Sequence, residues 1–457
     1  RTGHGIDPRS REVHGAMVKR VAGFPAASPT KVGLSAEPFA RLRGAIKHNV
    51  ALGSLPGCAH VVLKDGMCVF ACAHGWSDRD SQVPFSLDTL CALHGATKPL
   101  LVAAFFTLVE EGKVKLSDPI SKHMPFADRV ITKRGARTTM RLRTRPTVKH
   151  LLTMTAGVGY DDFPAYASIM NQIRMGKISD LSEFSDALAH APLQSEPGSR
   201  YNYSFCTDLL GRLCERVSGE AVDRFIQTRL LDPLGMADSH FQQRIPKDKL
   251  WRVASFYKSV RVRKTAVFKL TRWKPTRKTT APGIMSCGGG VLGYGDFGMV
   301  GSVRDYAQFC QMLLSGGQVA DGPRVLRKST VKTLWRDGLT PFQCDGRLPG
   351  WNDSEDGMRD WDKVGWSLLN SHLCFKSGPC TVSRRGHTMW MGGGGGAYWS
   401  INKKSGIASL SFAPVFGGRC SEDDGLGPLA NDASLFATDA WEGRKERRCA
   451  EKKRRYS

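Results

Sequence analysis

The stretch His94-Gly95-Ala96-Thr97-Lys98-Pro99-Leu100 decides how the rest of this chain is interpreted. It places a lysine three residues after a glycine, at the start of an apolar run. Residues three apart on a helix share a face, so position 95 and Lys98 are expected one turn apart at a helix N-terminus. Apolar residues then recur at three- and four-residue spacing as far as Glu110-Glu111-Gly112, which predicts a core-facing helix.

The chain is strongly basic, with a formal net charge of +24 over 457 residues. Its 41% apolar and 24% charged residues are typical of a globular protein rather than a disordered one. The excess charge indicates an acidic partner, such as nucleic acid, an anionic surface or an acidic face within a protein assembly. Much of the excess lies from Lys133 to Lys149, from Lys258 to Lys278 and from Arg444 to Arg455. An ordinary solvated surface is the alternative for each stretch.

Hydropathy and cysteine usage exclude several classes of protein. No apolar run approaches the roughly 18 residues of a membrane helix, so we expect no transmembrane span. The 13 cysteines are scattered and form no Cys-x-x-Cys pair, which argues against a disulfide framework and a zinc site and fits a reducing compartment. The chain begins at Arg1, which is consistent with processing, truncation or an incomplete gene model. A removed peptide that targets a mitochondrion or another organelle stays an open alternative.

Strand signals lie at both ends of the chain and helical signals between them. Two strands at residues 60–63 and 67–72 are joined by the turn Lys64-Asp65-Gly66, and two more are expected at residues 398–402 and 407–413. This order predicts an α/β (α+β) fold with an antiparallel sheet lobe at about 30–95 and 285–420, and a helical lobe at about 96–284. Residues 1–29 are expected to form a basic extension, 258–278 a basic insertion, and 421–457 a basic tail.

Several short blocks recur in one order along the chain: Val32-Gly33-Leu34-Ser35, Thr97-Lys98-Pro99, Asp118-Pro119-Ile120, Arg145-Pro146-Thr147, Tyr203-Ser204 followed by Asp208-Leu209-Leu210-Gly211, Leu231-Asp232-Pro233-Leu234-Gly235, and Asp305-Tyr306-Ala307. Together they resemble the serine beta-lactamase-like family, in its class C beta-lactamase, esterase and penicillin-binding-protein-related branch, which includes mitochondrial beta-lactamase-like proteins. The resemblance covers about residues 30–415. It implies a beta-lactamase/transpeptidase-like fold, with an antiparallel sheet flanked by helices and a mainly helical lobe.

The resemblance also implies a chemistry. In this family a serine attacks a carbonyl carbon, a lysine and a tyrosine move its proton, and two backbone N–H groups stabilise the oxyanion. Lys98 matches the lysine, and Tyr203 matches the tyrosine of the second motif. Met391-Gly392-Gly393 resembles the motif on the C-terminal strand, which would place the backbone of Gly394 on the oxyanion side.

The chain departs from the family pattern at the nucleophile. Gly95 stands in the place of the serine and has no side chain with which to form an acyl-enzyme. Thr97 is a poor substitute, because it belongs to the motif in its own right and is expected to point away from the carbonyl. A further block, Leu151 to Gly157, carries Met154 and Ala156 where the family has histidine and serine. Loss of a nucleophile costs on the order of a millionfold in turnover.

Two further features have a functional and a structural interpretation. His94 adjoins the nucleophile position, but a lone buried histidine is more often a satisfied core residue, and it stays unassigned. The stretch from Lys258 to Lys278 is flanked or interrupted by aromatic residues such as Tyr257 and Trp273, a combination that can contact nucleic acid. Its alternating apolar residues suit an exposed hairpin equally well.

These observations favour a catalytically inactive member of the family, a pseudoenzyme that acts as a structural or docking subunit of a larger assembly. Lys98 and Tyr203 are then vestigial, with no cofactor and no metal. One alternative is a weakly active esterase, amidase or beta-lactam hydrolase that works without a serine at position 95. Another is a sensor that binds a ligand in the vestigial pocket.

Overall fold

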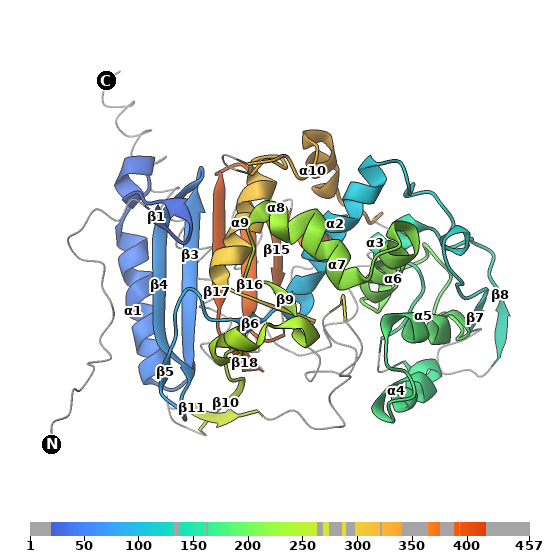
Figure 1. Ribbon diagram of the computed structural model, residues 1–457, viewed down its shortest axis with the longest axis horizontal. Helices are drawn as coiled ribbons and strands as arrows, with labels where there is room; N and C mark the ends of the chain where they lie inside the picture. Colours follow the sequence, from blue (N-terminus) through green and yellow to red (C-terminus); the bar gives the residue numbers. More distant parts are fainter. Residues whose placement is uncertain are drawn as a thin grey trace, which may run out of the picture.

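The computed structural model describes residues 20–131, 138–160, 163–262, 268–273, 286–288, 298–319, 322–340, 364–374, 388–392 and 394–416. Figure 1 shows a sheet lobe beside a helical lobe, as the order of strand and helix signals predicts. Of the basic stretches, the one from Arg444 to Arg455 lies outside the described residues, and the other two are described in part.

The centre of the sheet lobe is an eight-stranded antiparallel sheet with the order β13-β14-β15-β16-β17-β3-β4-β5. Its strands come from both ends of the chain, and β17 pairs with β3 so that Ser409 lies opposite Val62. In the same order, the bounds are Val364–Trp366, His372–Cys374, Thr388–Gly392, Ala397–Asn402, Ile407–Phe412, Gly57–Lys64, Met67–Asp78 and Val83–Pro84. The predicted β3–β4 turn is present, and Asp65 and Gly66 both adopt positive φ there.

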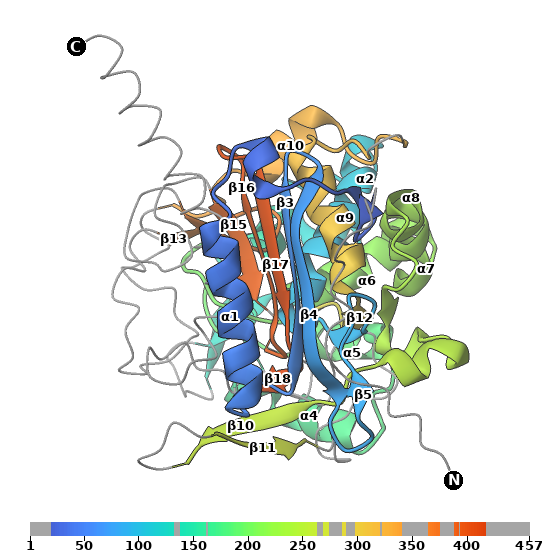
Figure 2. The same cartoon turned by 90° about the vertical axis from the view of Figure 1, so that its left-hand side faces the viewer.

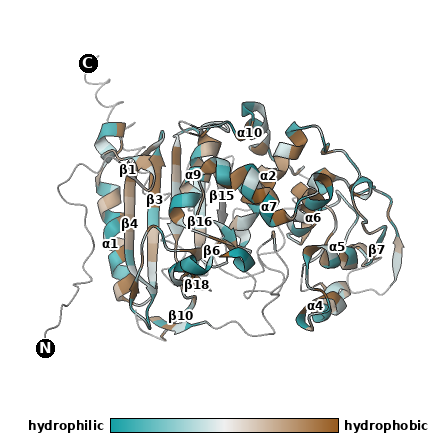
Figure 3. Ribbon diagram, viewed as in Figure 1, coloured by the Kyte–Doolittle hydropathy of each residue, from teal (hydrophilic) through white to brown (hydrophobic). Residues whose placement is uncertain are grey.

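Helices cover both faces of this sheet (Figures 1 and 2). Successive residues of a strand point to opposite faces, so Val62 of β3 packs in the core beneath α1 (Glu37–Ala51), whereas Val61 faces the core that contains α9 (Val303–Leu314). In Figure 3, α1 carries both hydrophilic and hydrophobic residues, while β4 beside it carries apolar residues. The N-cap of α1 is Ala36, without a side-chain cap bond.

The helical lobe surrounds α2 (Thr97–Glu110) and α6 (Cys206–Ser218), which contact one another. Nearly every side chain of α2 is buried, as expected for a helix with apolar residues on most of its circumference. The remaining elements are α3 (Val148–Leu152), α4 (Ala167–Arg174), α5 (Leu181–Ala189), α7 (Val222–Ile226), the π-helix Gln227–Leu231, α8 (Asp232–Leu234) and the paired strands β7 (Arg129–Ile131) and β8 (Thr139–Arg141).

The structure changes two of the expected boundaries. Residues 20–29 were expected in a basic extension, but β1 (Arg20–Val21) and β2 (Phe24–Pro25) form a hairpin and Phe24 is buried in the core. The basic stretch after Lys258 was expected in the helical lobe. Instead, β10 (Tyr257–Arg261) pairs with β11 (Phe268–Arg272) and with β18 (Val415–Phe416), which follows directly on the last strand of the central sheet.

A small sheet connects the two lobes. In it, β12 (Met299–Gly301) pairs with β6 (Cys91–Ala92) on one side and with β9 (His240–Phe241) on the other. The helix α10 (Lys328–Leu334) lies farther along the chain. Among the described residues, no helix is long and apolar enough to cross a membrane. Strand β6 ends two residues before His94, so this small sheet sets the position of the stretch from His94 to Leu100.

Candidate active site

The stretch from His94 to Leu100 begins with a short 3-10 helix, His94–Ala96, that runs directly into α2. Its backbone is held from two sides. The Leu93 N–H donates to the carbonyl of Met299 at 2.8 Å, and the Tyr306 hydroxyl donates to the carbonyl of Ala96 at 2.8 Å. Gly95 is therefore held in a buried and fixed position, one turn before Lys98.

The side chain of Thr97 is already hydrogen-bonded within the fold. Its hydroxyl accepts a hydrogen bond from the backbone N–H of Met299 at 3.1 Å, and the side chain is fully buried. It thus points toward β12, in agreement with the expectation that it does not take the place of a nucleophile.

Lys98 is fully buried, and its ammonium group is held by two neighbours. Its Nζ donates to the carbonyl of Gly288, 190 residues away in the sequence. The same Nζ lies 4.5 Å from the centroid of the Tyr203 ring, which allows a cation–π interaction. Tyr203 is half-buried and meets Trp366 edge-on at 5.9 Å between ring centroids. The structure thus brings together the lysine and the tyrosine that the sequence singled out.

Asp208 completes this cluster, although sequence reasoning assigned it no role. It lies in the first turn of α6 and is buried, and its Oδ1 accepts from the Gly288 N–H at 3.0 Å and from the Ser286 hydroxyl at 3.1 Å. Burial raises the pKa of its carboxyl group, while these hydrogen bonds and the charge of Lys98 act in the opposite direction. Gly288 therefore bridges Lys98 and Asp208. The available signal was a carboxylate five residues after Tyr203, at the start of an amphipathic helix.

His94 adopts a left-handed backbone conformation, with φ +45°, that is unusual for a residue with a side chain. It is buried, and its ring lies 5.8 Å from that of Phe256. A Cβ atom added to Gly395 would lie 2.5 Å from His94 Cδ2, so the imidazole contacts the backbone of the β15–β16 turn. Gly394, expected on the oxyanion side, is an exposed residue of the same turn, and Gly393 lies outside the described residues.

The block that carries Met154 forms a wall behind Tyr203. Met154 is buried with φ +53°, and its sulfur lies 3.9 Å from the hydroxyl of Ser204. The carbonyl of Leu152 accepts from Trp366 Nε1 at 3.2 Å, which fixes the indole against the Tyr203 ring. Met154 and Ala156 are both buried in this wall, beside the hydrogen-bonded hydroxyls of Thr153 and Thr155.

The geometry combines a buried lysine, a tyrosine and a carboxylate at the start of two core helices, beside the last strands of an antiparallel sheet. The model of the family described as Beta-lactamase matches residues 42–414, which is most of the chain. The chain belongs to the beta-lactamase family. Its mixed α/β fold, with the antiparallel sheet and flanking helices, is therefore the one that the sequence predicted.

Two proteins with similar sequences and one solved structure are similar to most of this chain or to a large part of it. An uncharacterized protein of Mycobacterium tuberculosis is 33% identical over 277 residues, a match that covers 59% of this chain and 64% of that protein. Esterase EstB of Burkholderia gladioli is 27% identical, over 84% of this chain and 92% of the esterase. Simvastatin synthase LovD of Aspergillus terreus has the same fold, with a TM-score of 0.70 and 22% identity over 88% of this chain and 99% of LovD.

The basic stretch after Lys258 lies on the β10–β11 pair, at a distance in the sequence from this beta-lactamase-type site. Lys258 and Lys269 are exposed there, and Val260 beside them is 51% exposed. Residues 263–267 and 274–278 of this stretch lie outside the described residues, as do residues 133–137 of the earlier one. The described part of the later stretch is the exposed hairpin that was one of its two interpretations.

Proposed function

We propose that this member of the beta-lactamase family is a slow hydrolase of carboxylic esters or related acyl compounds, and that it works without an acyl-enzyme at position 95. The supporting observation is the Lys98–Tyr203–Asp208 cluster. A buried lysine and carboxylate cost several kcal/mol of desolvation each, and apolar residues of similar size would stabilise the core as well or better. Buried ionisable groups that are joined in this way, with Lys98 and Asp208 both bonded to Gly288, mark a candidate functional site.

The proposed reaction is an attack of water on the acyl carbonyl. In the proposed step the Tyr203 oxygen starts as a phenolate beside the Lys98 ammonium group. The water oxygen forms a bond to the carbonyl carbon as its proton passes to that phenolate, and the resulting phenol returns a proton to the alcohol as the C–O bond breaks. Gly95 takes no part in a covalent step, because it has no side chain. The ester-hydrolase activity named for the relative EstB supports this choice of substrate class.

The test compares the wild type with Tyr203→Phe on p-nitrophenyl esters and on nitrocefin. The wild type should turn over at least one substrate above the buffer rate, and Tyr203→Phe should return that rate to the buffer value. Tyr257→Phe is the matched control, since it removes a phenol that accepts from the backbone N–H of Arg79 outside the site. Wild-type rates equal to buffer on all substrates would overturn the proposal.

A second experiment separates the two possible nucleophiles. A fluorophosphonate probe should leave the wild type unlabelled and should label Gly95→Ser, because the restored hydroxyl would lie one turn before Lys98. Labelling of the wild type would place a nucleophile elsewhere in the chain. Failure to label a correctly folded Gly95→Ser variant would mean that the cluster is no longer arranged to activate a hydroxyl.

The second candidate function is a non-catalytic docking subunit, which the net charge of +24 and the exposed basic face of β10–β11 favour. It predicts salt-dependent binding of a polyanion that is weakened by Lys258→Glu together with Lys269→Glu. It also predicts no ester turnover. A thermal shift with beta-lactams or short acyl esters in the absence of turnover would instead favour a ligand sensor.

A further inference from the structure

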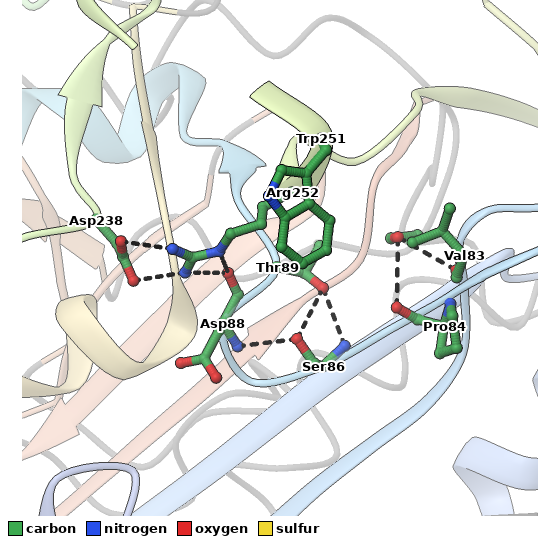
Figure 4. A pocket seen from close by; sticks show the side chains of 9 residues that line it. Val83, Pro84, Ser86, Asp88, Thr89, Asp238, Trp251 and Arg252 are labelled. Carbon is green, nitrogen blue, oxygen red and sulfur yellow. Dashed lines mark hydrogen bonds and ion pairs between the residues drawn. The ribbon is translucent and has the colours of Figure 1, made fainter. Parts of the chain in front are cut away.

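A surface hollow of about 430 Å³ lies outside the Lys98–Tyr203 site and shares no lining residue with it. Its volume is within the range of about 300–1,000 Å³ that is typical of small-molecule sites. It is formed where the end of β4, strand β5 and the following loop meet the turn before β9 and the 3-10 helix Lys247–Arg252 (Figure 4). It is lined by Ser77, Val83, Pro84, Ser86, Asp88, Thr89, Asp238, Trp251 and Arg252.

Trp251 is the largest apolar side chain of this wall, and 72% of it is exposed. The backbone that carries it is fixed by its neighbour Arg252, whose guanidinium binds both carboxylate oxygens of Asp238 at 2.8 and 2.5 Å. The same guanidinium donates twice to the carbonyl of Asp88, at 2.6 and 3.1 Å. The indole is therefore presented to the hollow from a fixed segment, and a flat exposed indole is a common surface for a ligand to pack against.

The charges around the hollow are already paired. Asp238 binds Lys249 at 3.0 Å in addition to Arg252, and Asp88 binds Arg304 at 2.9 Å. Each charged residue of the lining thus has a partner of opposite sign, and carboxylates outnumber cations in the lining. A phosphate or another anion would gain no unpaired cation and would face two carboxylates. A nucleotide phosphate would therefore have to compete with an existing ion pair for each of these cations, which disfavours a nucleotide at this hollow although the chain as a whole is basic.

The opposite wall offers hydrogen-bonding groups. The Ser86 hydroxyl accepts from the Asp88 N–H at 3.2 Å, and the Thr89 hydroxyl accepts from the Ser86 N–H at 2.9 Å. A hydroxyl has one donor and two acceptor positions, so both retain capacity for a ligand. The side chain of Asp88 is 45% exposed and can accept from ligand hydroxyls despite its ion pair. Ser86, Asp88 and Thr89 line the same hollow as Trp251 (Figure 4).

We propose that this hollow binds an uncharged carbohydrate. A sugar ring has an apolar C–H face that would pack on the indole of Trp251, and hydroxyls at its edge that would bond to Asp88, Ser86 and Thr89. A neutral ring also leaves the existing ion pairs intact. This inference goes beyond the proposed hydrolase function and does not depend on it.

The test is calorimetric titration of the full chain with three neutral probes: maltotriose, cellotriose and triacetylchitotriose. At least one should bind saturably. Trp251→Ala should weaken that binding about tenfold or more, because it removes the largest apolar surface of the wall. Trp251→Phe keeps a flat ring and should retain part of the affinity.

Leu250→Ala is the matched control, since Leu250 is 52% exposed on the same short helix but does not line the hollow. It should bind the sugar as the wild type does. The proposal is overturned if none of the three sugars binds, if a sugar binds Trp251→Ala as tightly as the wild type, or if adenosine monophosphate shows Trp251-dependent binding that no sugar shows. Unchanged circular dichroism of the variants excludes loss of the fold as the cause.

Discussion

The ammonium group of Lys98 lies 4.5 Å from the centre of the Tyr203 ring and is bridged to the carboxylate of Asp208 through Gly288. A buried cation, an aromatic face and a buried anion thus form one unit in this beta-lactamase-type fold. Their interaction energies should be non-additive, because each compensates for the burial of another.

The Lys98–Asp208 pair should therefore show a large coupling in a double-mutant cycle. Lys98→Met and Asp208→Asn should each lower the free energy of unfolding by about 3–5 kcal/mol if each leaves a buried charge without compensation. The double variant should lose much less than the sum. Urea denaturation followed by circular dichroism measures this, and strictly additive losses would show that the two groups do not interact.

The backbone of His94 provides a second prediction. A residue with a side chain pays roughly 1–2 kcal/mol for the left-handed conformation, and glycine does not. His94→Gly should consequently be more stable than His94→Ala by about 1 kcal/mol. Both variants lose the same contact with Phe256, so the difference between them isolates the backbone contribution. Equal stability, or a more stable alanine variant, would show that position 94 does not need positive φ.

Asp118 should make the stability depend on acid pH. Its Oδ2 accepts from the backbone N–H of Lys115 at 3.0 Å and also contacts Lys122 and His123. These interactions, with the backbone hydrogen bond first among them, lower the pKa of its carboxyl group from the usual 3.8 to about 2.

Because the folded pKa is the lower one, the stabilisation is present above pH 4 and is lost as the pH falls toward 2. Asp118→Asn should cost about 2 kcal/mol at pH 7, and the gap between the variant and the wild type should close at acid pH. The measurement is the free energy of unfolding at pH 7, 4 and 2. A gap that is the same at all three values would contradict it.

Asp305 should make the stability fall as the pH rises, which is the opposite of the effect expected for Asp118. It is largely buried at the start of α9, where it accepts from the Asp238 N–H at 2.7 Å and from the Ser239 hydroxyl at 2.9 Å. Burial is the main reason that the pKa of its carboxyl group is raised to about 6.

Because the folded pKa is the higher one, the contribution of Asp305 to the free energy of unfolding is fully present below pH 4 and is lost as the pH rises through 6. Asp305→Asn keeps an oxygen acceptor without the charge, so it should remove this decline, which amounts to about 3 kcal/mol between pH 4 and pH 7. Thermal unfolding at those two values tests it. Parallel pH profiles for the wild type and the variant would show that another group is responsible.

Local patterns predicted the elements that depend on neighbours in the sequence. The three- and four-residue spacing after Lys98 predicted α2. The turn at Asp65-Gly66 predicted the β3–β4 hairpin. Each pattern is complete within a few residues, and no distant contact is needed to recognise it.

Distant contacts explain the elements that were misplaced. Nothing in residues 20–29 indicates that Phe24 is buried, because the surface that covers it is built by strands and helices farther along the chain. Strand β10 was assigned to the helical lobe because of its position in the sequence. Its pairing with β18 is a contact across more than 150 residues.

The sequence by itself determined that position 95 carries no side chain, that Lys98 follows one helical turn later, and that the chain belongs with the beta-lactamase family. Only the tertiary structure decided that Lys98 meets Gly288 and Asp208, that Thr97 is bonded to β12, and that Trp251 stands at the wall of a hollow. The physical reason is that composition and periodicity are properties of neighbouring residues. Charge compensation in a core, in contrast, depends on which distant groups the packed fold brings within hydrogen-bonding distance.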